Sequence, residues 1–284
     1  MVIITGVGGQ LGNAIKQVFS GLEEDIVCFD RNDLDITKNE EISKMFAKYK
    51  PNIVINCAAY NKVEQAGESI KEAYEINAFG PYLLARVAGE CGAKFVHIST
   101  DYVFDGNKNS YTETDCPKPV NVYGASKLAG EQLVRLANKN SFIVRTSWLF
   151  GKNKDNSEKN FVKTMIAKAK KENEVRVVED QVGSPTYTND LAKKIKELLS
   201  SDAEPGIYHI TNSGHCSWYE FAKKIFEFSK IEADVTPIKT SESDTKIKRP
   251  ASSVLENNRL KEVGLPVLRS WQEAVSDYIN EISV

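Results

Sequence analysis

The chain has 284 residues, of which 41% are hydrophobic and 27% are charged, and its formal net charge is −2 at pH 7. The composition is ordinary for a water-soluble globular protein, and the slightly negative charge excludes long-range attraction to nucleic acid or to an anionic membrane. The sequence has no signal-peptide pattern at MVIITG and no run near the roughly 18 apolar residues of a membrane span. We therefore expect a cytoplasmic protein with no nucleic-acid or membrane partner, which binds phosphate groups through local donors.

Short apolar runs alternate with helical patterns through the first half of the chain. Strands are predicted at 2–5, 26–29, 53–56, 95–98 and 142–146, and helices at 10–20, 38–49, about 68–91 and 124–139. Strands rich in Val and Ile that are separated by helices are typical of a parallel sheet covered on both faces. The pattern predicts an α/β fold with a Rossmann-like, doubly wound parallel sheet.

The regular alternation ends near residue 150. Further helices are predicted at 160–171, 191–200, 217–228 and 270–282, and strands at 175–178 and 207–211, with polar loops at 151–160 and 240–250. We expect residues 1–150, with about 188–211, to form an NAD(P)-binding domain. Residues 151–187 and 212–284 are predicted to form a smaller substrate-binding lobe.

The cysteines and histidines do not form a metal-binding pattern. The five cysteines have no CxxC spacing, and Cys28 and Cys57 lie in apolar runs, so buried reduced thiols are expected. His97 and His209 fall in predicted strands, and His215 stands alone in a polar loop. A structural zinc site would need these ligands in a cluster. No metal site is predicted.

A glycine-rich loop follows the first predicted strand. In TGVGGQLG (5–12), Gly6, Gly9 and Gly12 keep a GxxGxxG spacing between a strand and a helix. Such glycines allow a tight turn and the close approach of a pyrophosphate to the backbone, while the helix N-terminus faces the phosphates. The alternative is a glycine-rich turn with no ligand. The strand–loop–helix context favours a dinucleotide site.

The end of the second predicted strand bears on which dinucleotide is bound. Asp30 lies 18 residues after Gly12, where a carboxylate accepts hydrogen bonds from the adenosine ribose. Arg31 follows and could pair with a 2′-phosphate instead. Asp30 favours NADH and Arg31 favours NADPH, so both cofactors stay open. Asp30 could also be only a solvated turn residue.

Tyr123 and Lys127 in VYGASKLAGEQL (122–133) are spaced four residues apart on a predicted helix, so their side chains share a face. A free tyrosine has a pKa of about 10, and a neighbouring cation lowers it toward the range of acid–base catalysis. Ser99 and Thr100 end a strand at the ligand-binding edge and can hold a substrate oxygen. The alternative is a capping tyrosine and a solvated lysine. Agreement with the glycine loop favours catalysis.

These motifs, with Asn77 in INAFG, resemble the extended short-chain dehydrogenase/reductase superfamily. Within it the chain most resembles the dTDP-4-dehydrorhamnose reductase family, and the similarity runs almost end to end. The stretches that carry it are TGVGGQLG, DLDIT (33–37), INCAAY (55–60), STDYVFDG (99–106), YGASKLAGE (123–131), RTSWLFG (145–151), NFVKTM (160–165), DQVGSPTY (180–187), SWYEFA (217–222) and RPASSVL (249–255).

The resemblance implies reduction of the C4 ketone of dTDP-4-dehydro-L-rhamnose with hydride from NADPH or NADH. It implies that Tyr123 donates the proton, while Lys127 binds the nicotinamide ribose and lowers the tyrosine pKa. It also implies that Thr100 hydrogen-bonds to the substrate oxygen, that Asp101 contacts the sugar and that Trp148 lines the sugar pocket.

The resemblance also maps cofactor contacts onto this sequence. They fall on Gly6, Gly9, Gln10, Leu11, Gly12, Asp30, Arg31, Asp35, Ile36, Ala58, Ala59, Tyr60, Asn77, Ser99, Tyr123 and Lys127. Four residues have a purely structural alternative. Trp148 could belong to the core, Asn77 could organise a backbone network, and Trp218 and Tyr219 could pack the lobe. Arg249 is open between a contact to the substrate diphosphate and a basic surface loop.

Two rival functions share much of this pattern. A nucleotide-sugar dehydratase or epimerase would have the same fold, but dehydratases carry a second acid where Tyr102 follows Asp101. A non-catalytic NADP-binding regulatory subunit would not need the Thr100, Tyr123 and Lys127 set. Some family members dimerise through a metal bridged by carboxylates, one of them on the first helix, but here that helix reads NAIKQVF (13–19) and has no acid. A monomer or weak homodimer is therefore predicted.

Overall fold

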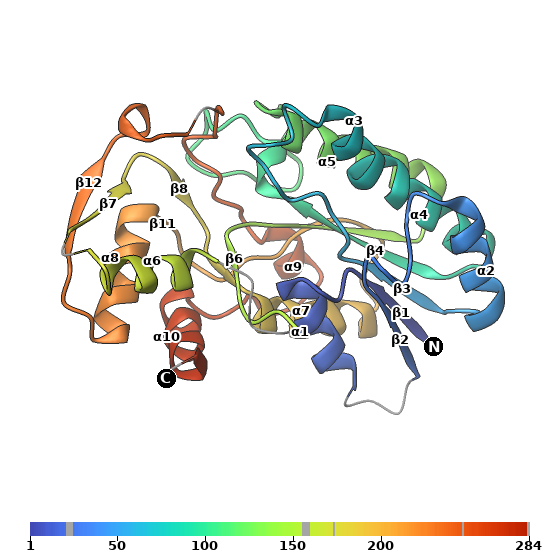
Figure 1. Cartoon of the computed structure of the whole chain (residues 1–284). Helices are drawn as coiled ribbons and strands as arrows, with labels where there is room; N and C mark the ends of the chain where they lie inside the picture. The colour runs from blue at the N-terminus through green and yellow to red at the C-terminus, as the bar shows by residue number, and fades with distance from the viewer. Residues whose placement is uncertain (21–24, 155–159, 173, 246, 283–284) are drawn as a thin grey trace.

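The computed structural model describes residues 1–20, 25–154, 160–172, 174–245 and 247–282. At its centre lies a sheet of six strands in the order β10-β5-β4-β3-β1-β2, with all neighbours parallel (Figure 1). The strands are β1 (Val2–Thr5), β2 (Ile26–Phe29), β3 (Ile53–Asn56), β4 (Lys94–Thr100), β5 (Ser141–Thr146) and β10 (Gly206–His209). The predicted Rossmann-like parallel sheet is confirmed.

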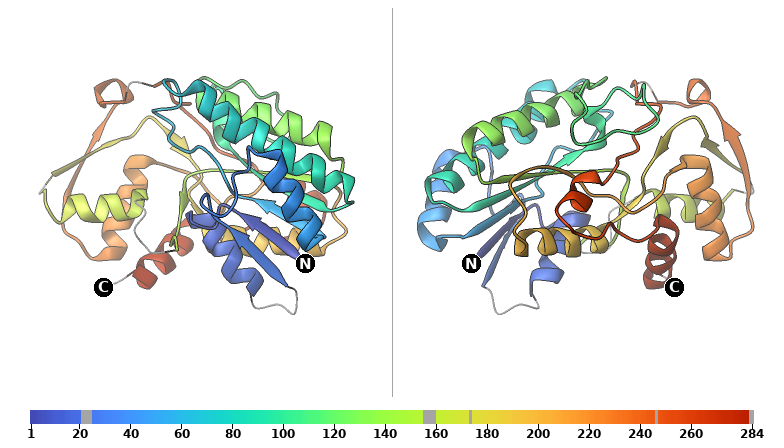
Figure 2. Two further views of the ribbon diagram at one scale, coloured as in Figure 1. Left: turned by 45° about the vertical axis from the view of Figure 1, so that its right-hand side comes forward. Right: turned by 180° about the vertical axis from the view of Figure 1, so that it is seen from behind.

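Helices cover both faces of this sheet (Figure 2). The helices of the α/β part are α1 (Gln10–Ser20), α2 (Asn39–Tyr49), α4 (Gly80–Glu90), α5 (Val122–Ala137) and α7 (Thr188–Ser200). Val2 and Ile4 of β1 pack in one apolar cluster with α1 and α7, whereas Ile3 packs in another with α2, α4 and α5. Because successive strand residues point to opposite faces, continuous apolar runs are needed where both faces are covered.

The order of the strands reverses beside β1. The chain runs from β1 outward to β2 and then crosses back to β3 on the other side of β1. In open parallel sheets, such a switch point leaves a crevice at the carboxyl ends of the strands, where ligands bind. The fold therefore places the glycine loop after β1 directly at this crevice.

A smaller lobe lies beside the carboxyl edge of the sheet, around its own apolar cluster (Figure 1). Its helices are α6 (Phe161–Ala169), α8 (Trp218–Ser229) and α10 (Trp271–Ile282). Its strand pairs are β7 (Glu174–Val178) with β12 (Asp234–Ile238), β8 (Val182–Gly183) with β11 (Cys216–Ser217), and β6 (Leu149–Phe150) with β9 (Thr186–Tyr187). The short helices η2 (Asp101–Val103), η3 (Thr240–Glu242) and α9 (Asn258–Glu262) join these parts.

The helix predicted at about 68–91 is confirmed as an unbroken helical run over residues 70–90, but it contains a π-turn. It comprises α3 (Ile70–Tyr74), a π-helical turn η1 (Glu75–Phe79) and α4, and the Gly80 N–H bonds to the carbonyl of Glu75, five residues back. Pro81 has no N–H to donate to the Asn77 carbonyl, as a regular α-helix would require. A wide turn at this point is the physical result, and single π-turns often mark functional sites.

All five cysteines are free, but they are not all buried. Cys216 is buried, whereas Cys91 at the end of α4 and Cys116 in a loop are exposed. The expectation of buried thiols is therefore wrong for these two, which lie outside the apolar runs. Within the described ranges, the structure contains no helix with the length and hydropathy of a membrane span.

The contact between α5 and η1 leaves no room for a side chain at Gly130. A Cβ there would lie 2.1 Å from the backbone oxygen of Asn77. We expect Gly130→Ala to lower the free energy of unfolding by about 1–3 kcal/mol through overpacking. Gly67→Ala is the control, because a Cβ at Gly67 meets nothing within 4 Å. Urea unfolding measures both; equal midpoints would contradict the close helix contact.

Candidate active site

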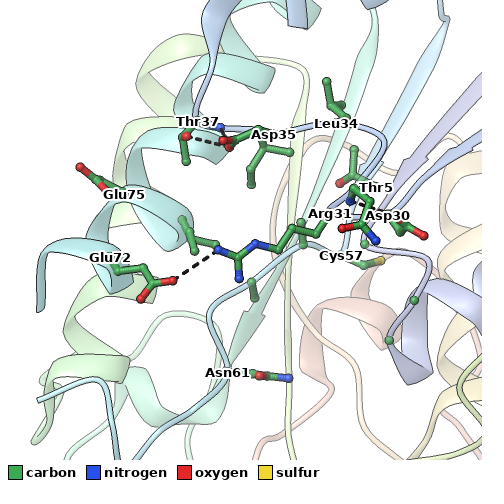
Figure 3. A pocket seen from close by; sticks show the side chains of 18 residues that line it. Thr5, Asp30, Arg31, Leu34, Asp35, Thr37, Cys57, Asn61, Glu72 and Glu75 are labelled. Atoms are coloured by element: carbon green, nitrogen blue, oxygen red, sulfur yellow. Dashed lines mark hydrogen bonds and ion pairs between the residues drawn. The ribbon is translucent and has the colours of Figure 1, made fainter. Parts of the chain in front are cut away.

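A cavity of about 660 Å³ lies at the carboxyl ends of β1, β2 and β3, where the strand order reverses. Figure 3 shows the side chains that surround it. The lining residues are Thr5, Gly6, Gly8, Gly9, Asp30, Arg31, Asn32, Leu34, Asp35, Ile36, Thr37, Cys57, Ala58, Ala59, Asn61, Glu72, Glu75 and Ile76. The cavity therefore has the position and the glycine-rich wall of a dinucleotide site.

Two glycines of the loop are sterically required. Gly6 has φ +73°, and a Cβ on it would lie 2.5 Å from the Ala58 nitrogen; a Cβ on Gly12 would lie 2.2 Å from the Gly6 oxygen. The loop can therefore lie against β3 and α1 only without side chains. Since α1 begins at Gln10, its first N–H groups lack partners within the helix and can bind phosphate oxygens. The loop fits a pyrophosphate.

The far end of the cavity is formed by the loop after β2. Asp30 accepts a 2.8 Å hydrogen bond from the Asn32 N–H, and its second carboxylate oxygen lies 3.9 Å from the Lys154 ammonium. Asp35 accepts hydrogen bonds from the N–H and the hydroxyl of Thr37, which lower the pKa of its carboxyl. Both carboxylates are fixed by turns, so they offer fixed acceptors to a ribose.

The structure separates the predicted cofactor residues into two groups. Those that line the cavity are Gly6, Gly9, Asp30, Arg31, Asp35, Ile36, Ala58 and Ala59. Those outside its lining are Gln10, Leu11, Gly12, Tyr60, Asn77, Ser99, Tyr123 and Lys127. The Leu11 side chain is buried in the core, so only its backbone N–H can serve a phosphate. The amide oxygen of Gln10 accepts a hydrogen bond from Asn160 of the lobe.

Asn77 in the π-turn organises backbone. It is fully buried, accepts a 2.8 Å hydrogen bond from the Tyr60 N–H, and donates to the Tyr60 carbonyl and the Ser126 hydroxyl. Ser126 in turn donates to the Tyr123 carbonyl. Asn77 thus ties the segment after β3 to the first turn of α5. The network alternative describes its contacts better than a direct cofactor contact.

Lys127 is a buried ammonium. It is 2% exposed, and its Nζ donates a 2.6 Å hydrogen bond to the Ile98 carbonyl of β4. Burial lowers the pKa of Lys127 to about 8, although the charge of Glu131 opposes this. A lysine near that pKa can hold or release a proton near neutral pH.

Tyr123 lies one turn before Lys127, on a helix capped by Asn121. Burial raises the pKa of Tyr123 above its usual range, and a hydrogen bond with Thr100 opposes the rise. The structure thus differs from the expectation that Lys127 lowers this pKa, because burial is the largest influence on the phenol and the ammonium donates to the Ile98 carbonyl instead. Tyr123 keeps its proton at neutral pH.

Thr100 and Asp101 lie beside this phenol at the end of β4. The Thr100 hydroxyl donates a 2.9 Å hydrogen bond to Asp101, which is 3% exposed. Burial raises the pKa of Asp101 to about 6, against hydrogen bonds from Ser253 and Thr100. The hydroxyls of Thr100 and Tyr123 therefore lie next to an acid that titrates near neutral pH.

A buried ion pair between Glu131 and Arg145 was not predicted from the sequence. Glu131 is 2% exposed and receives two hydrogen bonds from Arg145, which is 1% exposed, at 2.9 and 2.7 Å. It also accepts a 2.5 Å hydrogen bond from Ser99. The Ser99 hydroxyl therefore donates its hydrogen bond to Glu131 and not to a bound ligand. The sequence did contain a signal, because Glu131 continues the four-residue spacing of Tyr123 and Lys127.

Trp148 follows β5 in a left-handed backbone conformation, with φ +47°. Its ring stacks on Trp218 at 3.4 Å between centroids and 3° between planes. A Cβ on Gly183 would lie 2.3 Å from the Trp148 ring. Left-handed backbone at a bulky residue is costly and persists only where packing fixes it. Trp218 also contacts Phe161 at 4.4 Å, so it belongs to the lobe core and to the Trp148 support.

Arg249 connects the lobe to the part of the molecule that holds Tyr123. Its guanidinium donates a 2.9 Å hydrogen bond to Glu64 and also hydrogen-bonds to Tyr102, whose ring packs edge-on against Tyr123 at 5.7 Å. Arg249 therefore lies close to Tyr123, and these contacts do not fit the alternative of a basic surface loop. Tyr219 packs beside the lobe core, with Lys223 over its ring, as the packing alternative expects.

A second cavity of about 440 Å³ lies in the lobe beside Arg249. Its apolar wall includes Phe161, Met165 and Trp218, and Arg176 is a second guanidinium in it. An aromatic wall with two guanidinium groups can hold a planar base and an anionic group. Among the described residues, no group of three or more His, Cys, Asp or Glu side chains could hold a metal ion.

Comparison with known proteins gives matches over the whole chain. A family model described as RmlD substrate binding domain matches residues 1–284. SpsK of Bacillus subtilis, a spore coat polysaccharide biosynthesis protein, is 42% identical over 99% of this chain and 98% of its own. A dTDP-4-dehydrorhamnose reductase of Aggregatibacter actinomycetemcomitans is 37% identical over 97% of both chains.

Solved structures agree with these matches. A dTDP-4-dehydrorhamnose reductase of Clostridium acetobutylicum is 43% identical, with a TM-score of 0.95, over 100% of this chain and 99% of its own. That of Bacillus anthracis, in complex with NADP, is 44% identical, with a TM-score of 0.94, over 99% and 98%. The predictions of this family, of an oxidoreductase and of a nicotinamide dinucleotide cofactor are confirmed.

The buried ammonium makes stability depend on pH. Because the folded-state pKa of Lys127 is about 8 and the unfolded-state value is about 10.4, the unfolded chain binds more protons between these values. The Lys127 contribution to the free energy of unfolding therefore rises with pH in this window. We expect wild type to gain about 2–3 kcal/mol relative to Lys127→Met between pH 8 and 10. Exposed Lys44→Met should parallel wild type; parallel curves for both variants would contradict the prediction.

The stacked indoles give a spectroscopic test of the Trp148 support. Close parallel indoles couple their transitions, so wild type should show an exciton couplet in far-ultraviolet circular dichroism. Trp218→Phe and Trp148→Phe should each remove it. Trp271→Phe should keep it, because Trp271 packs edge-on against Phe221. A couplet that survives in both Trp148 and Trp218 variants would show that the rings do not stack.

Proposed function

The chain belongs to the RmlD family, and from this premise we propose that it reduces the C4 ketone of dTDP-4-dehydro-L-rhamnose to dTDP-L-rhamnose with NADPH or NADH. The observation that carries the proposal is the placement of Thr100, Tyr123 and buried Lys127 at the carboxyl edge of the sheet, beside the dinucleotide cavity. Relatives 34–37% identical, including the one from Aggregatibacter, carry the name of this reductase.

The reduced nicotinamide supplies a hydride to the carbonyl carbon when it is bound. The α/β part, residues 1–150 with about 188–211, holds the cofactor through the glycine loop and the ribose acceptors Asp30 and Asp35. Lys127 holds the nicotinamide ribose from α5. The segments 151–187 and 212–284 hold the substrate. The cavity at the switch point and the buried ammonium support this division.

The chain itself must supply the proton that completes an alcohol. Since burial keeps Tyr123 protonated at neutral pH, its hydroxyl donates to the carbonyl oxygen as negative charge develops there. The Thr100 hydroxyl holds the same oxygen. The Lys127 ammonium, one helical turn away, then stabilises the phenolate that remains.

The lobe cavity suits the nucleotide part of the substrate. Trp218 and Phe161 offer faces for the base, and Arg249 and Arg176 offer guanidinium groups for the diphosphate. Trp148 stacks on Trp218 of this cavity, and we assign the sugar to the space beside it. Glu64 must release Arg249 when the diphosphate binds, since the two are paired.

The identity of the sugar has a second candidate. A dTDP-4-keto-6-deoxy-D-glucose reductase of Streptomyces niveus is 34% identical over 96% of this chain. Its named substrate has a ketone at the same carbon, so the same proton donor would serve. The name of SpsK supports a role in making a nucleotide sugar for a surface polysaccharide. A dehydratase is less well supported, because dehydratases carry a second acid directly after Asp101. Here Tyr102 occupies that position and packs on Tyr123.

Coupled turnover tests the proposal. dTDP-glucose is supplied with its dehydratase, with or without the 3,5-epimerase, and loss of NADH or NADPH absorbance is followed. We expect oxidation that requires the epimerase; oxidation without it would favour the second candidate. Tyr123→Phe should lower kcat by about 10²–10⁴-fold, because it removes the proton donor. Tyr219→Phe is the matched control. No oxidation with either coenzyme would contradict the proposal.

A further inference from the structure

The outer end of the dinucleotide cavity is mostly acidic. Among the described residues that line it, four are carboxylates and Arg31 is the one cation. The carboxylates are Asp30, Asp35, Glu72 and Glu75. A 2′-phosphate would enter a site whose fixed charges repel it, except at this guanidinium. Selectivity between the two coenzymes therefore depends on what Arg31 contacts.

Arg31 reaches across the cavity to α3. Its Nη2 lies 3.5 Å from a carboxylate oxygen of Glu72, and the two side chains are 84% and 45% exposed. Figure 3 shows the guanidinium extended over the cavity toward Glu72, away from Asp30. Arg31 comes from the loop after β2 and Glu72 from the opposite wall, so the pair closes over the adenosine end. Both side chains are exposed enough to exchange partners.

Asp30 does not take part in this pair. One of its oxygens accepts from the Asn32 N–H, and the other lies 3.9 Å from Lys154. A ribose with free hydroxyls can therefore bind at Asp30 while Arg31 stays with Glu72. A ribose that carries a 2′-phosphate needs a cation beside Asp30. Arg31 is the one cation among the described lining residues, and the Lys154 ammonium lies outside that lining, where it pairs with Asp30 itself.

We infer that Glu72 lowers the preference for NADPH by competing with its 2′-phosphate for Arg31. Binding of NADH leaves the pair intact, whereas binding of NADPH breaks it. This inference rests on dinucleotide binding at the proposed site, but it does not depend on the identity of the sugar.

The expected size of the effect follows from the exposure of the pair. An exposed ion pair contributes little, so its loss costs NADPH about two- to fivefold in affinity. Hydrogen bonds between guanidinium and phosphate are stronger than this, so the phosphate prevails. The chain should therefore use both coenzymes, with a preference that Glu72 reduces.

Direct binding of NAD⁺ and NADP⁺, measured by calorimetry on the full-length protein, tests the inference without any sugar substrate. Glu72→Gln should raise the NADP⁺/NAD⁺ affinity ratio about two- to fivefold, and less at high salt because the pair is exposed. Arg31→Ala should lower the ratio tenfold or more through loss of a charge-assisted contact. Glu72→Gln should have no effect on the ratio in the Arg31→Ala background.

Glu75→Gln is the matched control. Glu75 lines the same cavity, but its ion pair is with Lys71, at 3.8 Å. The inference is overturned if Glu75→Gln raises the ratio as much as Glu72→Gln, since the effect would then be that of overall charge. It is also overturned if Arg31→Ala leaves the ratio unchanged. If neither dinucleotide binds, the proposed function fails together with the inference. If both bind but the ratios do not change as expected, only the inference fails.

Discussion

The burial of the Lys127 ammonium is the constraint on which the site depends. Removing a charge from water is costly unless hydrogen bonds and opposite charges compensate. Here the Ile98 carbonyl accepts from the ammonium, and Glu131 lies one turn further along the same helix. Glu131 also holds Arg145 of β5, so one carboxylate lies among two buried cations. An arrangement of this kind tolerates little displacement.

That charge arrangement fixes the position of α5. α5 contacts β4 through Lys127, and it contacts β4 and β5 through the Glu131 bonds to Ser99 and Arg145. Its backbone also packs against η1, where Gly130 meets the Asn77 carbonyl. Tyr123 lies one turn before these anchors, so its position follows from them. The phenol is thereby placed at the sheet edge, where it forms a hydrogen bond with Thr100.

The sequence predicted the parts of the molecule that depend on local pattern. The strands of the sheet and the helices around it were found, because apolar periodicity reports burial directly. The glycine loop was found because its spacing is a steric requirement of one turn. The helix predicted at 68–91 was found too, but its π-turn was not predicted, since Pro81 acts through a missing hydrogen bond that periodicity does not report.

The pairings between distant segments could not be predicted in the same way. Glu131 with Arg145, Trp218 with Trp148, and Glu72 with Arg31 each join residues from different elements. A charged residue on a predicted helix gives no sign of whether it is solvated or buried. The pKa of Tyr123 shows the difference clearly, because the spacing to Lys127 was right but burial outweighed the expected effect of the cation.

The low net charge gives these pairings a common role. A chain with a formal charge of −2 has no overall positive field to attract phosphate, so phosphate must be bound by individual guanidinium groups. Arg31 and Arg249 each pair with a carboxylate of an opposite wall, Glu72 and Glu64. Each pair keeps its guanidinium positioned while no phosphate is bound. Since Glu72 and Glu64 are partly exposed, each can return to water when a phosphate takes its place at the arginine. The exchange reduces the affinity for anions that cannot form two hydrogen bonds to one guanidinium.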